Sequence, residues 1–175
     1  MALNLKQLLS VGRRVARAAR QIQRGSPSNR PDGGPGPSGG PVTGYPGDFR
    51  GSARVQYSPV PGPEAGPGEV VWTWVPFEEL DGRGKDRPVL VVGRHGGYLL
   101  AAQLTSRDRN NRASQDPDYI DIGSGAWDSR GRPSEVKLDR ILQIDPRDVR
   151  REGGVLDERT FQAVSAGLRD RNGWS

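Results

Sequence analysis

The sequence predicts a small, mainly β domain that ends in one α-helix and follows a basic helix and a disordered linker. Three observations lead to this fold class. Short runs rich in valine, leucine and tryptophan alternate with polar, glycine-containing loops from residue 68 onward, a pattern typical of strands and turns. A helical pattern of apolar residues closes the chain, and glycine and proline are concentrated between residues 25 and 67. We therefore expect a helix over 1–24, a linker over 25–67 and a folded domain over 68–175.

The first 24 residues carry the pattern of an amphipathic helix. Apolar side chains recur at steps of three and four residues, and six basic residues with no acidic residue fill the rest. The apolar run before Arg13 is too short to cross a bilayer. Three interpretations stay open: binding to an anionic membrane surface, packing against a partner, and a solvated tail that assists nucleic-acid binding through its charge.

The next segment, residues 25–67, has the composition of a linker. It contains 11 glycines and 10 prolines. Such a stretch cannot bury enough apolar surface to offset the entropy lost on ordering it. We therefore expect it to be disordered. Its charges cancel, so the high isoelectric point of the chain comes from residues 1–24 and the domain is close to neutral.

Five strands are expected in the domain, over residues 68–75, 87–94, 97–106, 118–122 and 135–145. Trp72 and Trp74 share one face of the first strand, and we expect one in the core and the other at a dimer contact. The short connection after Arg94 predicts a hairpin. Alternation along the last strand places five side chains on one side: Val136, Leu138, Arg140, Leu142 and Ile144. Together these strands predict a curled sheet or small barrel.

The terminal helix has recognisable start and stop signals. Asp157 is the expected N-cap. Phe161, Val164 and Leu168 form the stripe expected to be buried, and Gly173 lies just beyond the expected end.

The composition excludes several kinds of site. The chain has no cysteine and one histidine, His95, which rules out disulfides, thiolate catalysis, sulfur-ligated zinc and paired catalytic histidines. The absence of cysteine fits a reducing compartment, and we expect a cytoplasmic protein. His95 lies in the hairpin connection, and we expect an exposed turn residue there.

The order of these runs resembles the MazF/PemK family of toxins. GEVVW is followed by a loop, by RPVLVV, by LLAAQLTS, by VKLDRILQID and by a terminal amphipathic helix. The resemblance covers about residues 67–168. It implies an SH3-like β-barrel, a homodimer, and a toxin of a type II toxin–antitoxin system that cleaves single-stranded RNA without a metal or other cofactor. It also implies a cognate antitoxin that covers the RNA groove with an extended segment.

The resemblance also assigns a catalytic pair. The family's arginine before proline at the start of the second strand falls on Arg87, and its threonine at the end of the third strand falls on Thr105. A guanidinium is a planar fork of donors with a fixed charge, which suits the oxygens of a scissile phosphate. Thr105 would donate a hydroxyl hydrogen bond to a non-bridging oxygen. A general-base role for arginine would demand an unusual environment, because its pKa is very high.

Substrate-binding residues are expected in three places. The loop over residues 78–86, which the family closes over the substrate, contributes Glu78, Arg83 and Lys85. The polar loop after the third strand contributes Ser106, Arg107 and Arg109, either as a clamp on a single strand or as a merely solvated loop. The fifth strand contributes Asp139 and Arg140. The match is looser there: some relatives have an arginine at the place of Leu142, which leaves base selection open.

A second class of function stays open beside the ribonuclease. Related toxins of this architecture block a topoisomerase and cut nothing. A catalytically inactive module that binds DNA, RNA or a protein is favoured by the near-neutral domain and by the departure at Leu142.

Overall fold

The computed structural model describes residues 44–60, 64–109 and 116–175, without the side chains of residues 151 and 152. The helix expected over residues 1–24 and the first part of the expected linker lie outside these ranges. No helix of the described residues is both long enough and apolar enough to cross a membrane.

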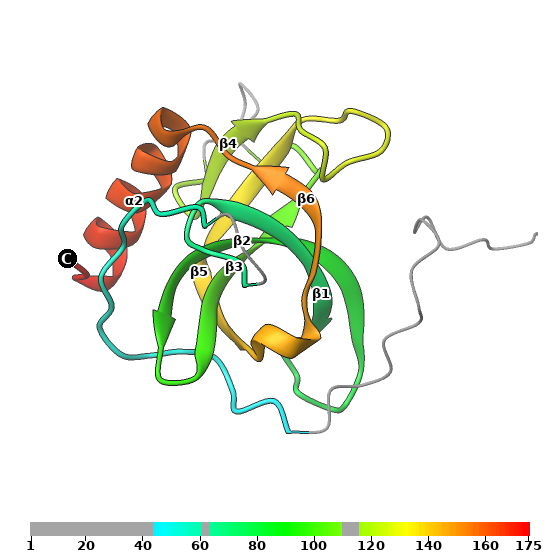
Figure 1. The fold of residues 1–175 in the computed structure, drawn as a ribbon, viewed down its shortest axis with the longest axis vertical. Helices are drawn as coiled ribbons and strands as arrows, with labels where there is room; N and C mark the ends of the chain where they lie inside the picture. The colour runs from blue at the N-terminus through cyan, green and yellow to red at the C-terminus, as the bar shows by residue number, and fades with distance from the viewer. Residues whose placement is uncertain (1–43, 61–63, 110–115) are drawn as a thin grey trace, which may run out of the picture. The chain divides into compact units, whose positions relative to one another are not determined.

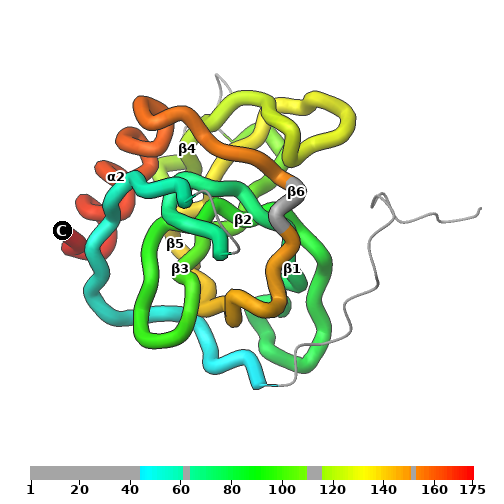
Figure 2. The backbone as a smooth tube through the Cα atoms, viewed as in Figure 1, coloured from blue at the N-terminus to red at the C-terminus, as the bar shows by residue number. Residues whose placement is uncertain are grey.

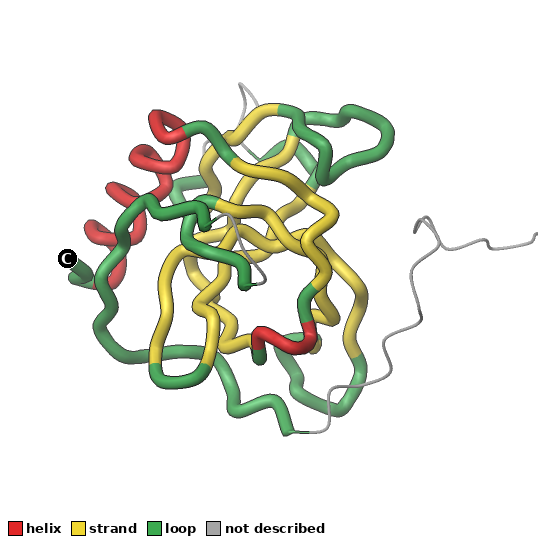
Figure 3. Tube along the Cα trace, viewed as in Figure 1, coloured by secondary structure: helices red, strands yellow, loops and turns green. Residues whose placement is uncertain are grey.

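Six antiparallel strands form one strongly curved sheet, a half-barrel, with a helix on one side (Figures 1 and 3). The strands are β1 (Glu69–Pro76), β2 (Gly84–His95), β3 (Tyr98–Thr105), β4 (Tyr119–Gly123), β5 (Ser134–Ile144) and β6 (Arg150–Val155). A 3₁₀ turn, η1 (Pro146–Asp148), precedes β6, and α2 (Glu158–Asn172) closes the chain. The strand order across the sheet is β4-β5-β3-β2-β1-β6. The mainly β prediction with a C-terminal helix is therefore confirmed.

The strand β6 was not predicted, and the expected count of five strands is wrong. Its sequence RREGGV has two glycines and no apolar alternation, a composition that disfavours strands. It forms because it pairs with the edge of β1, where Glu69 lies opposite Val155 and Trp72 opposite Arg150. The expected loop over residues 78–86 is also shorter, since β2 already begins at Gly84.

The hairpin between β2 and β3 is confirmed. His95 pairs with Tyr98 across the turn, and Gly96 adopts a φ of 56°, a left-handed conformation that glycine tolerates without strain. His95 is exposed, as expected.

The alternation expected along β5 is wrong at its centre. Ala102 of β3 pairs with Ile141, but Leu104 pairs with Val136, so a two-residue step on β3 corresponds to a five-residue step on β5. Extra residues in one strand reverse which face the following side chains occupy. Val136, Leu138 and Ile141 accordingly pack in the cluster that includes the helix, whereas Leu142 and Ile144 pack in a second cluster with Val71, Val89 and Val91.

The helix α2 begins and ends where the sequence predicts. Asp157 is the N-cap, and its carboxylate accepts a hydrogen bond from the Thr160 amide at 2.9 Å. Gly173 is the C-cap, with a φ of 64°. Phe161, Val164 and Leu168 are fully buried against the sheet.

Residues 44–60, which we call the strap, correct the expected domain boundary. The strap is irregular in structure and runs past the β2–β3 turn and then along α2 (Figure 2). Val55 is 2% exposed within the helix-side core. The Val55 amide donates to the Ser175 carbonyl at 2.9 Å, and the Tyr57 hydroxyl donates to the Leu156 carbonyl at 2.9 Å. The expected linker over 25–67 is therefore too long at its C-terminal end, because Phe49, Ala53, Val55 and Tyr57 pack in or against the helix-side core.

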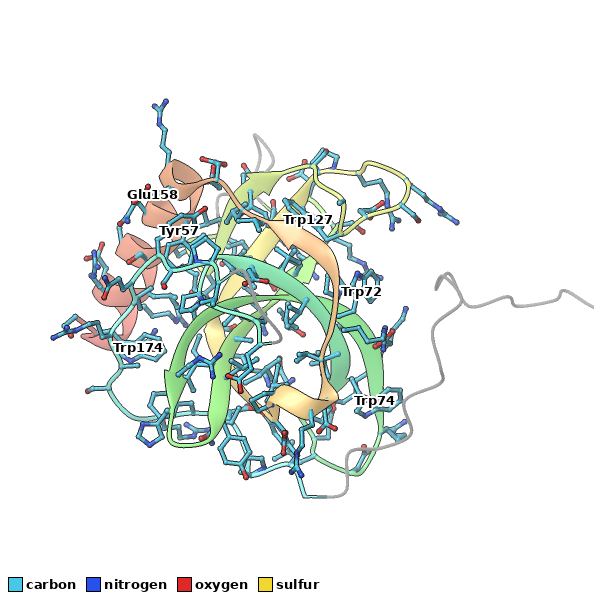
Figure 4. The ribbon with its side chains drawn as sticks, in the orientation of Figure 1. Tyr57, Trp72, Trp74, Trp127, Glu158 and Trp174 are labelled. Carbon is cyan, nitrogen blue, oxygen red and sulfur yellow. The ribbon has the colours of Figure 1, made fainter. Side chains whose placement is uncertain are left out.

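The tryptophans are arranged differently from the prediction. Trp72 and Trp74 are on the face of β1 opposite Val71 and Val75, as expected, but both are only half-buried. The buried tryptophans are Trp127 and Trp174, at 5% and 6% exposure. Figure 4 shows Trp174 at the C-terminal end of α2, where its indole donates to the Gly51 carbonyl of the strap at 2.9 Å.

Candidate functional site

Arg87 lies at the start of β2, opposite Thr73 of β1, and lines an open pocket of about 410 Å³. The pocket is formed by the end of β1 with the loop that follows it, the first part of β2, the last part of β3 and the centre of β5. Its lining residues are Val75, Pro76, Phe77, Glu78, Glu79, Arg83, Arg87, Gln103 and Arg140. Four of the residues predicted for the site, Glu78, Arg83, Arg87 and Arg140, therefore meet in one place.

The loop at residues 77–83 forms one wall and is held by two ion pairs. Arg83 binds Asp81, with Nε 2.7 Å from Oδ2, and its guanidinium lies 5.8 Å from the centre of the Phe77 ring. Glu78 accepts from Lys137 of β5 at 2.8 Å. This hydrogen bond lowers the pKa of Glu78. The contact to Lys137 ties the loop to β5 beside the pocket.

Lys137 also forms an ion pair with Asp139, a residue predicted for the site. Its ammonium lies 3.2 Å from the Asp139 carboxylate. Burial lowers the pKa of Lys137, but the hydrogen bonds to Glu78 and Asp139 outweigh it and raise the pKa above its ordinary value. Lys137 was not predicted, since nothing in the local pattern of β5 indicates that it bridges two acids. Asp139 itself is exposed and does not line the pocket.

Arg140 is the most buried charged residue of the pocket, at 6% exposure. Its Nε donates to Oδ2 of Asp48 at 2.9 Å, and its Nη1 donates to the Pro76 carbonyl at 2.8 Å. Its Nη2 is buried and has no hydrogen-bond partner among the described residues. The partner carboxylate Asp48 comes from the strap, so a residue outside the predicted domain binds one of the residues that line the pocket.

Asp48 is itself held by Tyr45. The Tyr45 hydroxyl donates to Oδ1 of Asp48 at 2.6 Å. Burial of the phenol raises the pKa of Tyr45, and this hydrogen bond raises it further by a smaller amount. Both residues lie in the segment whose composition predicted a linker, and neither was identified as a site residue.

Thr105 ends β3 and does not line the pocket. Its Oγ1 accepts from the Arg107 amide at 3.1 Å. The β2–β3 register pairs Val89 with Gln103. Arg87 and Thr105 each lie two residues beyond this pair along their own strands.

The remaining predicted residues do not line the pocket. Lys85, Ser106, Arg107 and Arg109 are exposed. The Arg109 amide donates to both carboxylate oxygens of Glu135, at 3.0 and 3.1 Å. Glu135, which was not predicted, thus fixes the start of the polar loop. Residues 110–115 of that loop lie outside the described ranges.

Comparison with known proteins identifies relatives of this fold. A sequence model of the family described as "PemK-like, MazF-like toxin of type II toxin-antitoxin system" matches residues 66–170. No curated protein matches the chain.

Solved structures similar to this one include three toxin structures. MazF (Form-I) from Deinococcus radiodurans has 20% identity and a TM-score of 0.48, covering 63% of this chain and 97% of its own. The MazE-MazF (Form-II) structure from the same organism has 20% identity and a TM-score of 0.45, covering 64% and 98%. The Mycobacterium tuberculosis toxin MazF-mt6 has 19% identity and a TM-score of 0.43, covering 60% and 98%.

Proposed function

The chain belongs to the PemK-like, MazF-like toxins of type II toxin–antitoxin systems, and on that premise we propose that it is a metal-independent, sequence-selective endoribonuclease that cleaves single-stranded RNA. The observation that carries this proposal is the gathering of Arg87, Arg83 and Arg140 around one pocket. Three guanidinium groups around a single hollow suit a phosphodiester backbone, because each is a fixed positive charge with several donors.

The proposed reaction uses the RNA's own nucleophile. The 2′-hydroxyl oxygen attacks the adjacent phosphorus, and the bond from phosphorus to the 5′-oxygen breaks. The attacking hydroxyl loses its proton and the leaving 5′-oxygen gains one, so the products are a 2′,3′-cyclic phosphate and a 5′-hydroxyl. The protein's task is to align this attack and to stabilise the extra negative charge on the phosphoryl oxygens.

We propose that Arg87 and Thr105 stabilise this negative charge. Arg87 would donate to the non-bridging oxygens. The Thr105 oxygen already accepts from the Arg107 amide, which orients the hydroxyl and leaves its proton to donate to the substrate. Removal of one preorganised donor of this kind costs roughly 100-fold to 1000-fold in rate.

The surroundings of the pocket fit a substrate that lies across it. Arg107 and Arg109 are exposed beyond Thr105, and Lys85 lies on β2 two residues before Arg87. We propose that these residues and Ser106 bind the flanking phosphates, and that Asp139 accepts a hydrogen bond from a donor group of the RNA other than its phosphates. The same proposal includes four further properties. The half-barrel closes into an SH3-like barrel, the protein forms a homodimer, it is located in the cytoplasm, and a cognate antitoxin covers the pocket.

A binding module without nuclease activity is the second candidate. The observation that favours it is the acidic character of one pocket wall, where Glu78 and Glu79 lie beside the arginines. Carboxylates repel phosphate, so a protein segment that offers both charges would suit this wall better than RNA.

The deciding experiment incubates the full chain with mixed-sequence single-stranded RNA in EDTA and maps the cut ends. We expect discrete cuts with cyclic-phosphate ends, reduced about 100-fold or more by Arg87→Ala. Arg94→Ala is the matched control, since Arg94 lies at the other end of the same strand and binds Glu64 and the Ala65 carbonyl. Intact RNA after incubation with folded wild-type protein would reject the ribonuclease and favour the binding module. Equal loss of cutting in both variants would reject the specific role of Arg87 in the reaction.

A further inference from the structure

The strap approaches the candidate pocket along β5. The Phe49 amide donates to the Ile141 carbonyl at 2.7 Å, and the Gln143 side-chain amide donates to the Gly47 carbonyl at 3.0 Å. In the strap, these two contacts lie on either side of Asp48; in β5, they lie one and three residues after Arg140. The backbone of the strap is therefore held in register with β5, and the Asp48 side chain is directed at the Arg140 guanidinium.

The strap is an addition to the part of the chain that the family shares. The family match begins at residue 66, so Asp48 lies before the matched region. Its partner Arg140, 92 residues away in the sequence, lies within that region. A role for Asp48 is thus not a property carried over from the family.

The Asp48 carboxylate is fully engaged. Its Oδ1 accepts from Tyr45 at 2.6 Å and its Oδ2 accepts from Arg140 at 2.9 Å. The tyrosine fixes the plane of the carboxylate, and the carboxylate in turn fixes one edge of the guanidinium. A carboxylate and guanidinium held in this way form a charge-assisted hydrogen bond with a defined geometry.

Arg140 connects this pair to the pocket wall. Its Nη1 donates to the carbonyl of Pro76, the last residue of β1 and the first of the wall that continues into the loop at residues 77–83. A guanidinium buried to this degree needs its counter-charge, because an unpaired buried charge is costly. Without Asp48, Arg140 would turn toward water, and both the Pro76 contact and the shape of the pocket would change.

We propose that Asp48 is a positioning residue for RNA binding: the strap delivers its carboxylate to Arg140, and Arg140 is thereby fixed as a charged wall of the pocket. This inference rests on the proposed ribonuclease function. Asp48 acts through Arg140 and touches no reacting atom. Its loss should therefore weaken the binding of substrate while Arg87 and Thr105 continue to serve the chemical step.

The kinetic test compares variants of the full chain on a single-stranded RNA oligonucleotide that the protein cleaves. Hydrogen bonds to charged groups have a strength that corresponds to about a tenfold to hundredfold change in affinity. We expect Asp48→Asn to raise KM by about that factor and to change kcat by less than about threefold. Asp48→Glu, which keeps the charge, should restore part of the affinity, and Tyr45→Phe should have a smaller effect in the same direction.

The matched control is Asp128→Asn. Asp128 also pairs with an arginine, with Arg132 Nε at 3.0 Å and Nη2 at 2.9 Å, but it lies in the β4–β5 loop and does not line the pocket. It should leave KM unchanged. Equal increases of KM in Asp48→Asn and Asp128→Asn, or a loss of kcat alone in Asp48→Asn, would overturn the proposal.

A second readout does not depend on cleavage. The Nε–H NMR signal of Arg140, assigned by its disappearance in Arg140→Lys, should exchange slowly with water in the wild-type protein, quickly in Asp48→Asn and at an intermediate rate in Asp48→Glu. If Asp48→Asn does not fold, Asp48→Glu and Tyr45→Phe provide the same comparison. An Arg140 signal that is unaffected by all three variants would refute the positioning role. An Asp48-dependent signal in a protein that does not cut RNA would instead reject the ribonuclease and retain the contact.

Discussion

Removal of the strap should destabilise the domain by a large fraction of its total stability. Two truncated chains test this: one that begins at residue 44, which keeps the strap, and one that begins at residue 66, where the family match begins. The second chain loses the buried side chain of Val55 and the carboxylate of Asp48. It also leaves Trp174 without the Gly51 carbonyl and without the Phe49 ring, whose centroid lies 5.8 Å from that of the Trp174 ring.

The magnitude follows from two of these losses. Burial of a valine side chain contributes about 1.5–3 kcal/mol. The strap's Phe49 also packs against the helix-side core, and burial of its side chain contributes a similar ~1.5–3 kcal/mol. Together they amount to roughly 3–6 kcal/mol, against the ~5–15 kcal/mol by which domains are stable. The chain that begins at residue 66 should therefore lose a large fraction of its stability at 25 °C.

The assay is urea unfolding followed by tryptophan fluorescence and by circular dichroism. Val55→Ala in the longer chain should lower the free energy of unfolding by about 1.5 kcal/mol or more. Val60→Ala is its control, since Val60 is 42% exposed in the same segment, and it should change stability by less than about 0.5 kcal/mol. If the chain that begins at residue 66 unfolds within about 1 kcal/mol of the longer chain, the strap is not part of the folded unit.

Three further predictions concern other parts of the chain. Asp157→Ala should destabilise the domain by about 1 kcal/mol through loss of the α2 N-cap, as measured by urea unfolding, whereas Asp170→Ala on the exposed face of the same helix should not. The pKa of Glu78 is lowered by Lys137, and a lowered carboxyl pKa stabilises the fold at pH values above the unfolded pKa, an effect that is lost as the pH falls through the folded pKa. Lys137→Ala should therefore raise the pKa of Glu78 in a ¹³C NMR titration and make stability depend less on pH in the acid range. An unchanged pKa of Glu78 would contradict the ion pair. A peptide of residues 1–24, which lie outside the described residues, should bind anionic vesicles or RNA with an affinity that falls as salt rises; no binding at low salt would exclude that role.

Local patterns in the sequence were sufficient for much of the fold. The β2–β3 hairpin, the caps of α2 at Asp157 and Gly173, and the buried stripe from Phe161 to Leu168 all follow from residues within a few positions of one another. Turn, cap and amphipathic signals act over one or two turns of chain, and so they can be read without the fold. The position of Arg87 was identified through the family resemblance, and the structure places it on a pocket with three other predicted residues.

Only the tertiary structure decided which distant residues meet. The pairing of β6 with β1, the change of face within β5 and the strap on the helix-side core depend on partners far away in the chain. The segment around Asp48 has the composition of a linker, yet Val55 and Asp48 find an apolar site and a buried guanidinium on a surface built by other segments. Burial and charge pairing are properties of the neighbours a residue acquires on folding, and for Asp48 and Arg140 those neighbours lie 92 residues apart.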